Sequence, residues 1–294
     1  MITLANLLIV VGCSKDSNKN KSPTFELLPQ HTLESFHLQG KVKKMTQYIY
    51  TLDQKNGQFV QGELFDEFPA ITTTEFNPEG LVTRVTIYER PQGAVVEKQE
   101  YRYDELHRLK SITYTNFTEP DVTEEKFEYT PEGHLSTLVI FVNGKLNSKI
   151  VYTTTATKEG YRLEFKSESP TNQFRTVNYY NRDNSLVKEE NYYADTLQST
   201  SNFVYDAQRR CVKEVFHAHT RSSLITSQFI YDKYGNLVNT IVDREGEDEA
   251  QNPADINHQE ARSEYTYDSQ GNVVRELRPD GEYPMIVTYQ IEYY

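Results

Sequence analysis

The chain has 294 residues, of which 37% are hydrophobic, and this is enough to bury a sizeable core. Its formal net charge is −12, and the sequence contains no cluster of Lys and Arg that could contact phosphates. These properties argue against a nucleic-acid-binding protein and against direct electrostatic docking on anionic lipid.

The chain begins with a short apolar segment that ends at a cysteine. Residues 4–12 read LANLLIVVG, and Cys13 and a polar stretch up to Ser22 follow. An apolar run of this length is too short for a permanent transmembrane helix and fits the hydrophobic part of a secretory signal. No Lys or Arg precedes the run, which leaves open a translation start upstream of Met1.

The segment Val10-Val11-Gly12-Cys13 resembles the lipobox of bacterial lipoproteins. The resemblance implies that residues 1–12 are a signal peptide, that Cys13 carries acyl chains such as palmitate, and that residues 13–23 form the lipidated cysteine and a flexible tether. We therefore expect a protein that is lipid-anchored in the bacterial cell envelope, at the outer membrane. Its periplasmic or surface orientation is open. The alternative is an ordinary N-terminus with a chance cysteine.

After a cap segment at residues 24–37, for which a short helix between Pro29 and Leu38 is possible, residues 38–294 form a tandem repeat. An aromatic anchor residue precedes each turn, and Tyr103 and Tyr129 show the usual spacing of 26 residues. The spacing from Tyr129 to Tyr180 is about twice the usual one, because it contains a degenerate unit near Thr155. The spacing from Tyr231 to Tyr267 is longer than usual, because it contains a polar insertion at about residues 243–262. The anchors are Tyr50, Phe76, Tyr103, Tyr129, Tyr180, Tyr205, Tyr231, Tyr267 and Tyr293.

The units share one turn template. An Asp that follows the anchor can accept a hydrogen bond from the backbone two residues on, and a Gly four residues past the anchor permits a positive φ. His107 and Arg209 hold this glycine position in two units, so we expect those turns to be strained or differently built. The residues with a structural role in the turns are Tyr103, Asp104, Tyr129, Gly133, Tyr205, Asp206, Tyr231, Asp232, Gly235, Tyr267, Asp268 and Gly271.

Runs rich in Thr, Val and Tyr follow the turns and favour strands over helices. Each unit is therefore predicted to be one β-hairpin. The predicted fold class is all-β: an antiparallel meander of about 18 strands that forms a strongly curved open sheet, a half-shell or a loose barrel. The last strand, within residues 283–294, is expected to leave an edge for something to cover.

The template resembles the YD repeat of bacterial RHS proteins over residues 38–294, on Tyr-Asp pairs such as Tyr231-Asp232 with Gly235. In that family the strands wind into a hollow shell that can enclose a toxin. This chain is far shorter than such a shell, so we do not expect enclosure. It is more similar to small lipid-anchored YD-repeat proteins of Bacteroidetes, and that similarity implies no established activity.

Two groups of residues invite a metal-binding interpretation. His217 and His219 would lie on one face of a strand, but no third ligand has a readable spacing. The carboxylates between Asp243 and Glu249 do not follow the order of a calcium loop. We interpret both groups as exposed polar residues and expect no metal or other cofactor.

Two further residues have specific predictions. The segment Asp195-Thr196-Leu197 looks like the acceptor of the Bacteroidetes O-glycosylation system, which makes Thr196 a possible glycosylation site; an ordinary hairpin turn explains it equally well. Cys211 lies at an apolar position six residues past Tyr205, which predicts a buried free thiol.

Exposed aromatic residues carry the functional hypothesis. The doublets Tyr179-Tyr180 and Tyr192-Tyr193 must point to both faces of the sheet, and exposed rings can stack on sugars or peptide groups. We predict a non-enzymatic envelope lipoprotein that acts as a binding or scaffolding module for a glycan or protein ligand. The alternatives are a periplasmic, chaperone-like carrier that shelters a ligand in its curved sheet, and a hydrolase that uses the acidic insertion.

Overall fold

The structure is a computed structural model of the chain, and it describes residues 31–66, 70–89, 93–168, 173–220, 222–246, 258–280 and 283–294. One 3-10 turn, η1 (Glu34–Phe36), lies where a short helix was considered possible, and strands make up most of the rest. The strands of the first half are β1 (Val42–Lys55), β2 (Gln58–Leu64), β3 (Ile71–Phe76), β4 (Val82–Tyr88), β5 (Val95–Tyr103), β6 (Leu109–Asn116), β7 (Val122–Tyr129), β8 (Leu135–Val142), β9 (Lys145–Ala156) and β10 (Gly160–Ser167). Those of the second half are β11 (Phe174–Asn181), β12 (Leu186–Tyr193), β13 (Thr196–Tyr205), β14 (Cys211–Ala218), β15 (Ser223–Tyr231), β16 (Leu237–Glu245), β17 (His258–Arg262), β18 (Glu264–Tyr267), β19 (Val273–Arg278) and β20 (Met285–Tyr293).

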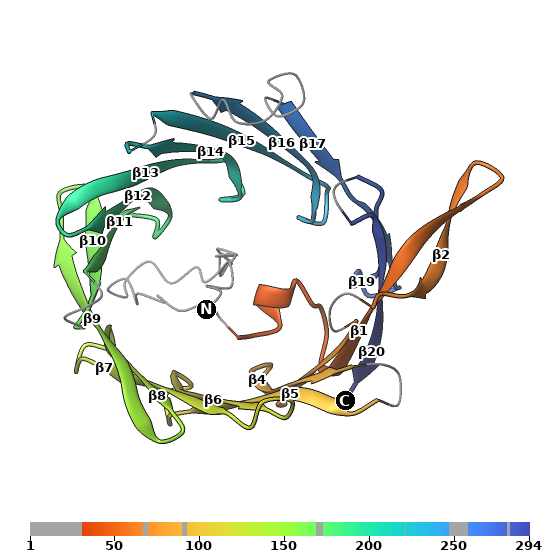
Figure 1. Cartoon of the computed structure of the whole chain (residues 1–294), viewed down its shortest axis with the longest axis horizontal. Helices are drawn as coiled ribbons and strands as arrows, with labels where there is room; N and C mark the ends of the chain where they lie inside the picture. Colours follow the sequence, from red (N-terminus) through yellow and green to blue (C-terminus); the bar gives the residue numbers. More distant parts are fainter. Residues whose placement is uncertain are drawn as a thin grey trace.

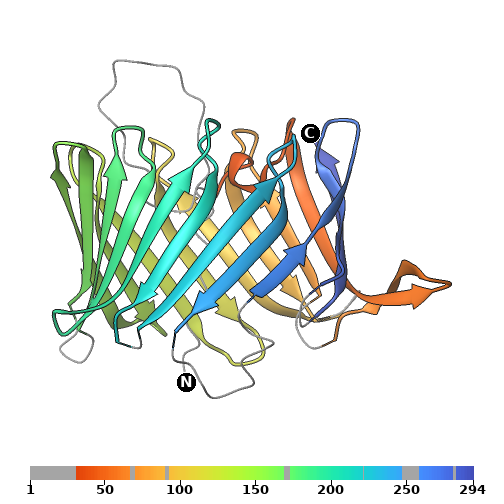
Figure 2. The same ribbon diagram turned by 90° about the horizontal axis from the view of Figure 1, so that it is seen from above.

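The strands form one antiparallel sheet that curves into a ring (Figures 1 and 2). Each strand from β3 to β17 pairs with the next one in the chain, and the same holds from β18 to β20. The predicted all-β antiparallel meander in the form of a loose barrel is therefore confirmed. The sheet contains 20 strands rather than about 18.

The first strand closes the ring onto the last. β1 pairs with β20 from Val42 opposite Tyr293 to Thr51 opposite Met285, and it pairs with β3 along its other edge. The last strand was expected to leave an edge for something to cover, and β1 is the element that covers it. In the described part of the chain no register joins β17 to β18, so one seam remains in the ring.

The N-terminal segment identifies the inner face of the ring, because η1 lies inside it (Figure 1). The ring of His31 lies 4.7 Å from that of Tyr101, and Phe36 packs edge-on against Phe76 at 5.6 Å. Side chains alternate along each strand, so the register extends this assignment around the sheet. A buried cluster packs on the inner face: Leu38, Val42, Met45, Phe76, Val82, Tyr101, Leu109, Ile112, Phe127 and Leu135.

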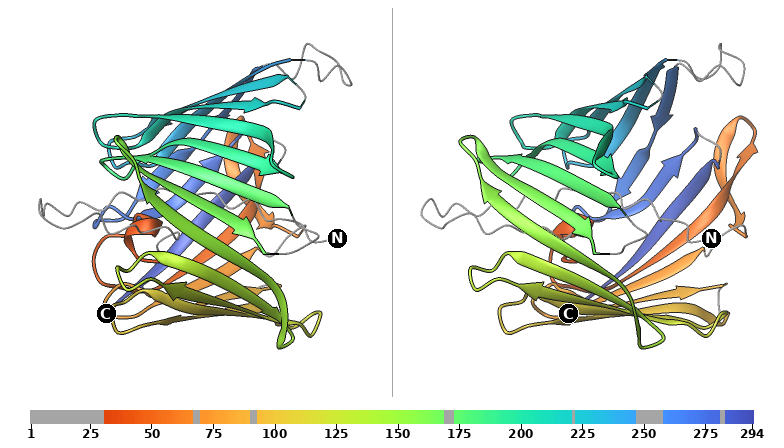
Figure 3. Two further views of the ribbon diagram at one scale, coloured as in Figure 1. Left: turned by 90° about the vertical axis from the view of Figure 1, so that its left-hand side faces the viewer. Right: turned by 60° about the vertical axis from the view of Figure 1, so that its left-hand side comes forward.

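The outer face is rich in ion pairs between strand residues. Lys98 lies 2.8 Å from Glu100, and Lys44 of β1 lies 3.0 Å from Glu292 of β20. The strands run obliquely along the wall of the ring, and the β1–β2 hairpin projects away from it (Figures 2 and 3). In the residues described, no helix is long and apolar enough to cross a membrane.

The turn template folds as its residues predict. The Asp206 carboxylate accepts hydrogen bonds at 2.9 Å from the backbone N–H groups of Gln208 and Arg210, and Arg209 N–H donates to the Asp206 carbonyl at 3.0 Å. The residue four past the anchor has a positive φ whether or not it is Gly, as His107 (61°) and Arg209 (65°) show; this holds for the anchors Phe76, Tyr103, Tyr129, Tyr180, Tyr205, Tyr231 and Tyr267. The turns at His107 and Arg209 are strained rather than differently built, since a left-handed backbone costs a non-glycine residue about 1–2 kcal/mol. The prediction of Tyr50 as an anchor is wrong, because β1 continues past it to Lys55.

Candidate functional site

Anchor tyrosines link each unit to the unit before it. The Tyr129 hydroxyl donates to the Leu109 carbonyl at 2.7 Å, which is the residue six past the preceding anchor. The same bond recurs with nearly the same length in three other units. We call this set the tyrosine ladder: Tyr103 to Val82 (2.8 Å), Tyr129 to Leu109 (2.7 Å), Tyr205 to Leu186 (2.8 Å) and Tyr231 to Cys211 (2.7 Å).

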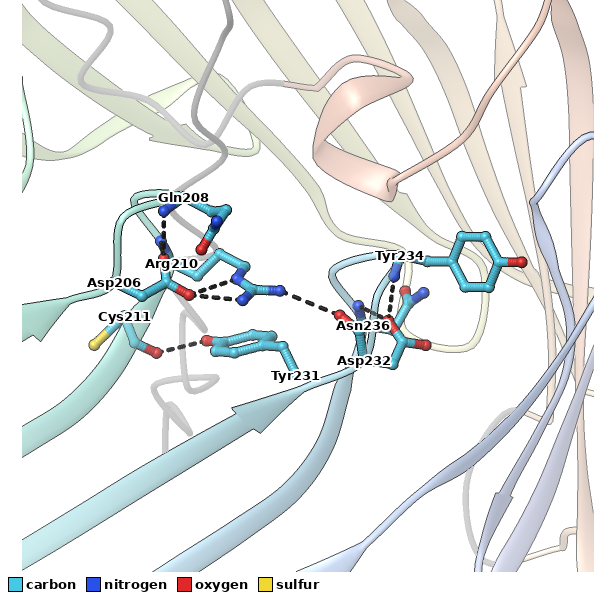
Figure 4. A network of polar contacts seen from close by, with 8 residues as sticks. All are labelled: Asp206, Gln208, Arg210, Cys211, Tyr231, Asp232, Tyr234 and Asn236. Atoms are coloured by element: carbon cyan, nitrogen blue, oxygen red, sulfur yellow. Dashed lines mark hydrogen bonds and ion pairs between the residues drawn. The ribbon is translucent and has the colours of Figure 1, made fainter.

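An arginine reinforces the ladder in two units. The Arg210 guanidinium pairs with the Asp206 carboxylate at 2.7 and 2.8 Å, and it also donates to the Asp232 carbonyl of the next turn at 3.2 Å (Figure 4). It lies 4.9 Å from the centre of the Tyr231 ring. Arg108 makes the equivalent contacts with its own aspartate and with the next anchor ring. The turn residues singled out from the sequence therefore hold neighbouring units together.

Side chains bridge the seam between β17 and β18, where the backbone pairing is interrupted. Tyr265 donates to the Leu237 carbonyl at 2.8 Å, and the Tyr267 hydroxyl bonds to the Asp232 carboxylate. The Tyr267 ring also lies 4.4 Å from the ring of Tyr234. The ladder thus continues across the seam by means of side chains.

The predicted ligand-facing doublets separate onto the two faces of the sheet. Tyr180 lies on the inner face, where its ring stacks on Tyr161 at 4.6 Å and 7°. Tyr193 packs against Phe174 at 5.1 Å, and both rings are about half exposed. The register places Tyr179 and Tyr192 on the opposite, outer face.

Tyr179 and Tyr192 converge on one glutamate of the outer face. Both hydroxyls donate to the same Glu190 oxygen, at 2.9 and 2.8 Å, and Lys188 lies 2.7 Å from the other oxygen. The Arg175 guanidinium lies 3.8 Å from the centre of the Tyr192 ring. β11 and β12 hold these residues side by side, because Arg175 pairs with Tyr192 and Tyr179 pairs with Lys188. We call Arg175, Tyr179, Lys188, Glu190 and Tyr192 the outer cluster.

Glu190 and the two tyrosines of the outer cluster each have one protonation state at neutral pH. Burial alone would raise the pKa of Glu190, but hydrogen bonds from Lys188, Tyr192 and Tyr179 outweigh it and hold the pKa below its usual value. Burial and the bond to Glu190 raise the pKa of Tyr179 to about 12. The glutamate is therefore ionised and the phenols are protonated. This network locks the side chains in place, so the cluster is preorganised.

Sequence reasoning missed a second polar cluster, which lies on the inner face. Tyr114 donates to Glu125 at 3.4 Å, and Tyr101 donates to Gln99 at 2.7 Å, which in turn donates to Glu97 at 2.7 Å. Burial raises the pKa of Glu125, against the opposing effect of the Tyr114 bond. The sequence could have predicted that these side chains share a face, because residues an even number of positions before an anchor point to the same face of the strand as the anchor.

The remaining candidates lie apart from both clusters. The rings of His217 and His219 approach to 4.2 Å, yet no group of three or more His, Cys, Asp or Glu that could hold a metal occurs in the described ranges. Cys211 is a free, half-buried thiol rather than a fully buried one, and burial raises its pKa. Thr196 is exposed beside a tight turn in which Ala194 and Asp195 have positive φ.

Two predictions fall wholly or partly outside the described residues. Cys13 and the lipobox-like segment are outside them. The acidic insertion is described only in part, because residues 247–257 lie outside the described residues. In the described part, the Asp243 carboxylate bonds to the His258 ring at 2.7 Å.

The fold and these contacts define an all-β repeat protein whose Tyr-Asp hairpins are joined from unit to unit by side chains. The sequence matches no protein-family model and no curated protein.

Solved structures with a similar arrangement include two porin-like proteins. One is from Bacteroides uniformis, with a TM-score of 0.41, 13% identity, and coverage of 90% of this chain and 100% of that one. The other is from Bacteroides vulgatus, with a TM-score of 0.37, 10% identity, and coverage of 87% and 99%. A structure of TcdB2-TccC3-TEV has a TM-score of 0.27 and 12% identity, and covers 83% of this chain and 16% of that one. At these values the similarity assigns neither a family nor an activity.

Proposed function

We propose that the protein is a non-enzymatic, lipid-anchored envelope protein that binds a glycan on the outer face of its sheet. The observation that carries the proposal is the outer cluster, in which an arginine stacks on Tyr192 while two phenols and a lysine surround one carboxylate. Aromatic rings supply flat apolar surfaces against which sugar rings can pack. Charged groups beside them supply hydrogen bonds that orient a polar ligand.

The position of the cluster supports a binding role rather than a packing role. Glu190 is almost buried, whereas the side chains of Lys188 and Arg175 are 39% and 25% exposed. The Glu164 and Asp195 carboxylates also lie 3.9 and 3.8 Å from the Arg175 guanidinium, and Asp195 is 94% exposed, so charges of both signs meet solvent here and can orient a polar ligand. A protein ligand with an acidic surface is the alternative outcome.

Removing the stacked pair is expected to abolish most of this binding. In the chain from Ser22 onward, Arg175→Ala combined with Tyr192→Ala should weaken binding to the best glycan of an array at least ten-fold, or about 1.4 kcal/mol. Lys44→Ala is the matched control, because it removes an outer-face charge from a distant ion pair with Glu292. Unchanged glycan binding by the double variant would contradict the assignment, and capture of an acidic protein alone would favour the alternative.

The lipid anchor is supported by the apolar segment that precedes Cys13. We expect Cys13→Ala to move the protein from the membrane fraction to the soluble fraction of fractionated cells, because an acylated cysteine would be its attachment. Ser14→Ala is the neighbouring control and should leave the protein with the membranes. Membrane association that survives Cys13→Ala would remove the lipoprotein proposal.

A carrier function is the second candidate, and the inner cluster favours it. Tyr101, Tyr114 and Glu125 place phenols and a partly buried carboxyl on the concave face of the ring. Such a surface suits a ligand that is largely enclosed. A small molecule that remains bound to the purified protein in native mass spectrometry, and is lost on Glu125→Leu, would favour the carrier.

A further inference from the structure

A patch of oxygen acceptors lies on the inner face of β11–β14, four adjacent strands in the wall of the ring (Figure 1). The register places Asn178 opposite Glu189, and Glu189 opposite Ser201. The Ser201 hydroxyl in turn donates to the Glu214 carboxylate at 2.9 Å. These residues lie on the inner face because Asn178 is two residues before Tyr180, whose ring lies on that face. We call Asn178, Glu189, Ser201 and Glu214 the acceptor patch.

Each of the two carboxylates in the acceptor patch is bound by a neutral side chain. The Asn191 amide donates to one Glu189 oxygen at 2.9 Å, just as the Ser201 hydroxyl donates to one Glu214 oxygen. Among the residues that the structure describes, no hydrogen bond reaches the second oxygen of either carboxylate. Neutral donors leave the negative charge in place, so both carboxylates keep a charge and an acceptor for a ligand.

Asn178 is buried, yet its side-chain oxygen has no hydrogen bond from the described part of the chain. The residue is 4% exposed, and Oδ1 is the unpaired atom. A buried acceptor without a partner is costly, so this atom indicates a donor that comes from outside the fold. Asn178 lies directly opposite Glu189, so a single donor group between them can contact both side chains.

Positive charge on these four strands lies on the other face of the sheet. The lysines and arginines of β11–β14 are Arg175, Lys188 and Lys213, and the register places all three on the outer face. Glu189 and Glu214 therefore face the interior without a lysine or arginine from their own strands to balance them. The acceptor patch is electronegative, and its charge complements a cation.

Aromatic rings border the acceptor patch. Phe203 lies opposite Glu214 and Phe216 lies opposite Ser201, and both rings are half-buried on the inner face. Such rings attract an ammonium group and pack against methylene groups, which favours an organic amine over a metal ion. Glu189 and Glu214 belong to strands two positions apart in the sheet, and the axes of such strands are separated by roughly 10 Å. This spacing suits a ligand with two positive charges.

We propose that the acceptor patch binds an aliphatic diamine or polyamine on the concave face of the ring. One ammonium group donates to Asn178 and Glu189, and a second donates to Glu214 while the methylene chain packs against Phe203 and Phe216. An ammonium group has three N–H donors and no acceptor, so it matches a site made of unfilled acceptors. The site faces inward, so it does not depend on glycan binding by the outer cluster, and it lies on other strands than the inner cluster.

The binding test uses the full chain and three probes in calorimetric titrations. Cadaverine has two ammonium groups, pentylamine has one, and 1,5-pentanediol has none. We expect cadaverine to bind roughly ten-fold more tightly than pentylamine, because its second ammonium group adds a charge-assisted hydrogen bond, and we expect no heat from the diol. Equal affinity for the two amines would overturn the contact with two carboxylates, and no heat from cadaverine at millimolar concentration would overturn the site.

Substitutions of the two glutamates decide whether the acceptor patch is the place of binding. Glu189→Gln and Glu214→Gln keep the size and the internal hydrogen bond but remove the charge, so each should weaken cadaverine binding roughly ten-fold, and the double variant should abolish it. Glu100→Gln is the matched control, because it removes a carboxylate from the outer face, where Glu100 lies 2.8 Å from Lys98. Wild-type affinity in the double variant, or an equal loss in Glu100→Gln, would show attraction by net charge alone and would overturn the proposal.

Discussion

Gly160→Ala is expected to destabilise the protein by about 3 kcal/mol or more, as overpacking against backbone does. A Cβ at this position would collide with the Tyr180 carbonyl oxygen and would lie 2.6 Å from the Asn181 carbonyl carbon. These are backbone atoms of the paired strand β11, so they cannot rotate away as a flexible side chain would. The two strands must separate at this point, and urea unfolding with hydrogen exchange at β10 and β11 measures the effect.

Two variants control for effects other than the collision. Glu159→Ala changes the exposed neighbouring residue and should leave stability within about 0.5 kcal/mol of wild type. Gly57→Ala has open space around its Cβ and a φ of 77°, so it tests backbone strain alone and should cost about 1 kcal/mol. A midpoint for Gly160→Ala that matches that of Glu159→Ala would show that β10 and β11 are not packed as described.

Acid is expected to destabilise the protein through its turn aspartates. The pKa of Asp206 is lowered: burial alone would raise it, but the backbone N–H and the guanidinium of Arg210 outweigh burial. The pKa values of Asp104, Asp232 and Asp268 are lowered for similar reasons. A lowered folded pKa gives stability that is present above the unfolded value of 3.8 and is lost as pH falls through the folded pKa.

Substitutions at Asp206 separate its two roles. Asp206→Ala removes the backbone acceptor and the ion pair, and should cost about 2 kcal/mol at pH 7. Asp206→Asn keeps the acceptor and removes the titrating group, so it should cost about 1 kcal/mol and show a smaller loss of stability below pH 4. Asn181 already makes this turn with an amide, accepting from Asp183 and Ser185 at 2.9 Å. Urea unfolding between pH 7 and pH 3 provides the measurement, and an acid loss in Asp206→Asn as large as in wild type would exclude the mechanism.

The hairpins could be predicted from the sequence because local rules determine them. The anchor Tyr205 ends β13, and Cys211, six residues later, begins β14. Period-two alternation and the aspartate turn act over a few residues, so one unit carries all the information needed for its own shape. The separation of Tyr179 from Tyr180 followed from the same alternation.

Contacts across strands and closure of the ring could not be predicted. That Tyr179 and Tyr192 share Glu190 depends on the register of two strands, which a bulge between Tyr179 and Tyr180 shifts. The sequence located a degenerate unit near Thr155, but only the register of β8 with β9 shows that Thr154 lies at the anchor position there. No local signal specifies that β1 joins β20, because the two strands come from opposite ends of the chain.

The union of β1 with β20 has a consequence for how the protein is made. During synthesis or export, β1 emerges long before β20. The edge of β1 that pairs with β20 therefore stays unpaired until β20 emerges. The Tyr294 N–H, which bonds to the Lys41 carbonyl at 2.9 Å, can complete the ring only after the whole of β20 has emerged. A chain that is truncated before β20 therefore forms an open arc with two unpaired strand edges. Such fragments are prone to associate edge to edge.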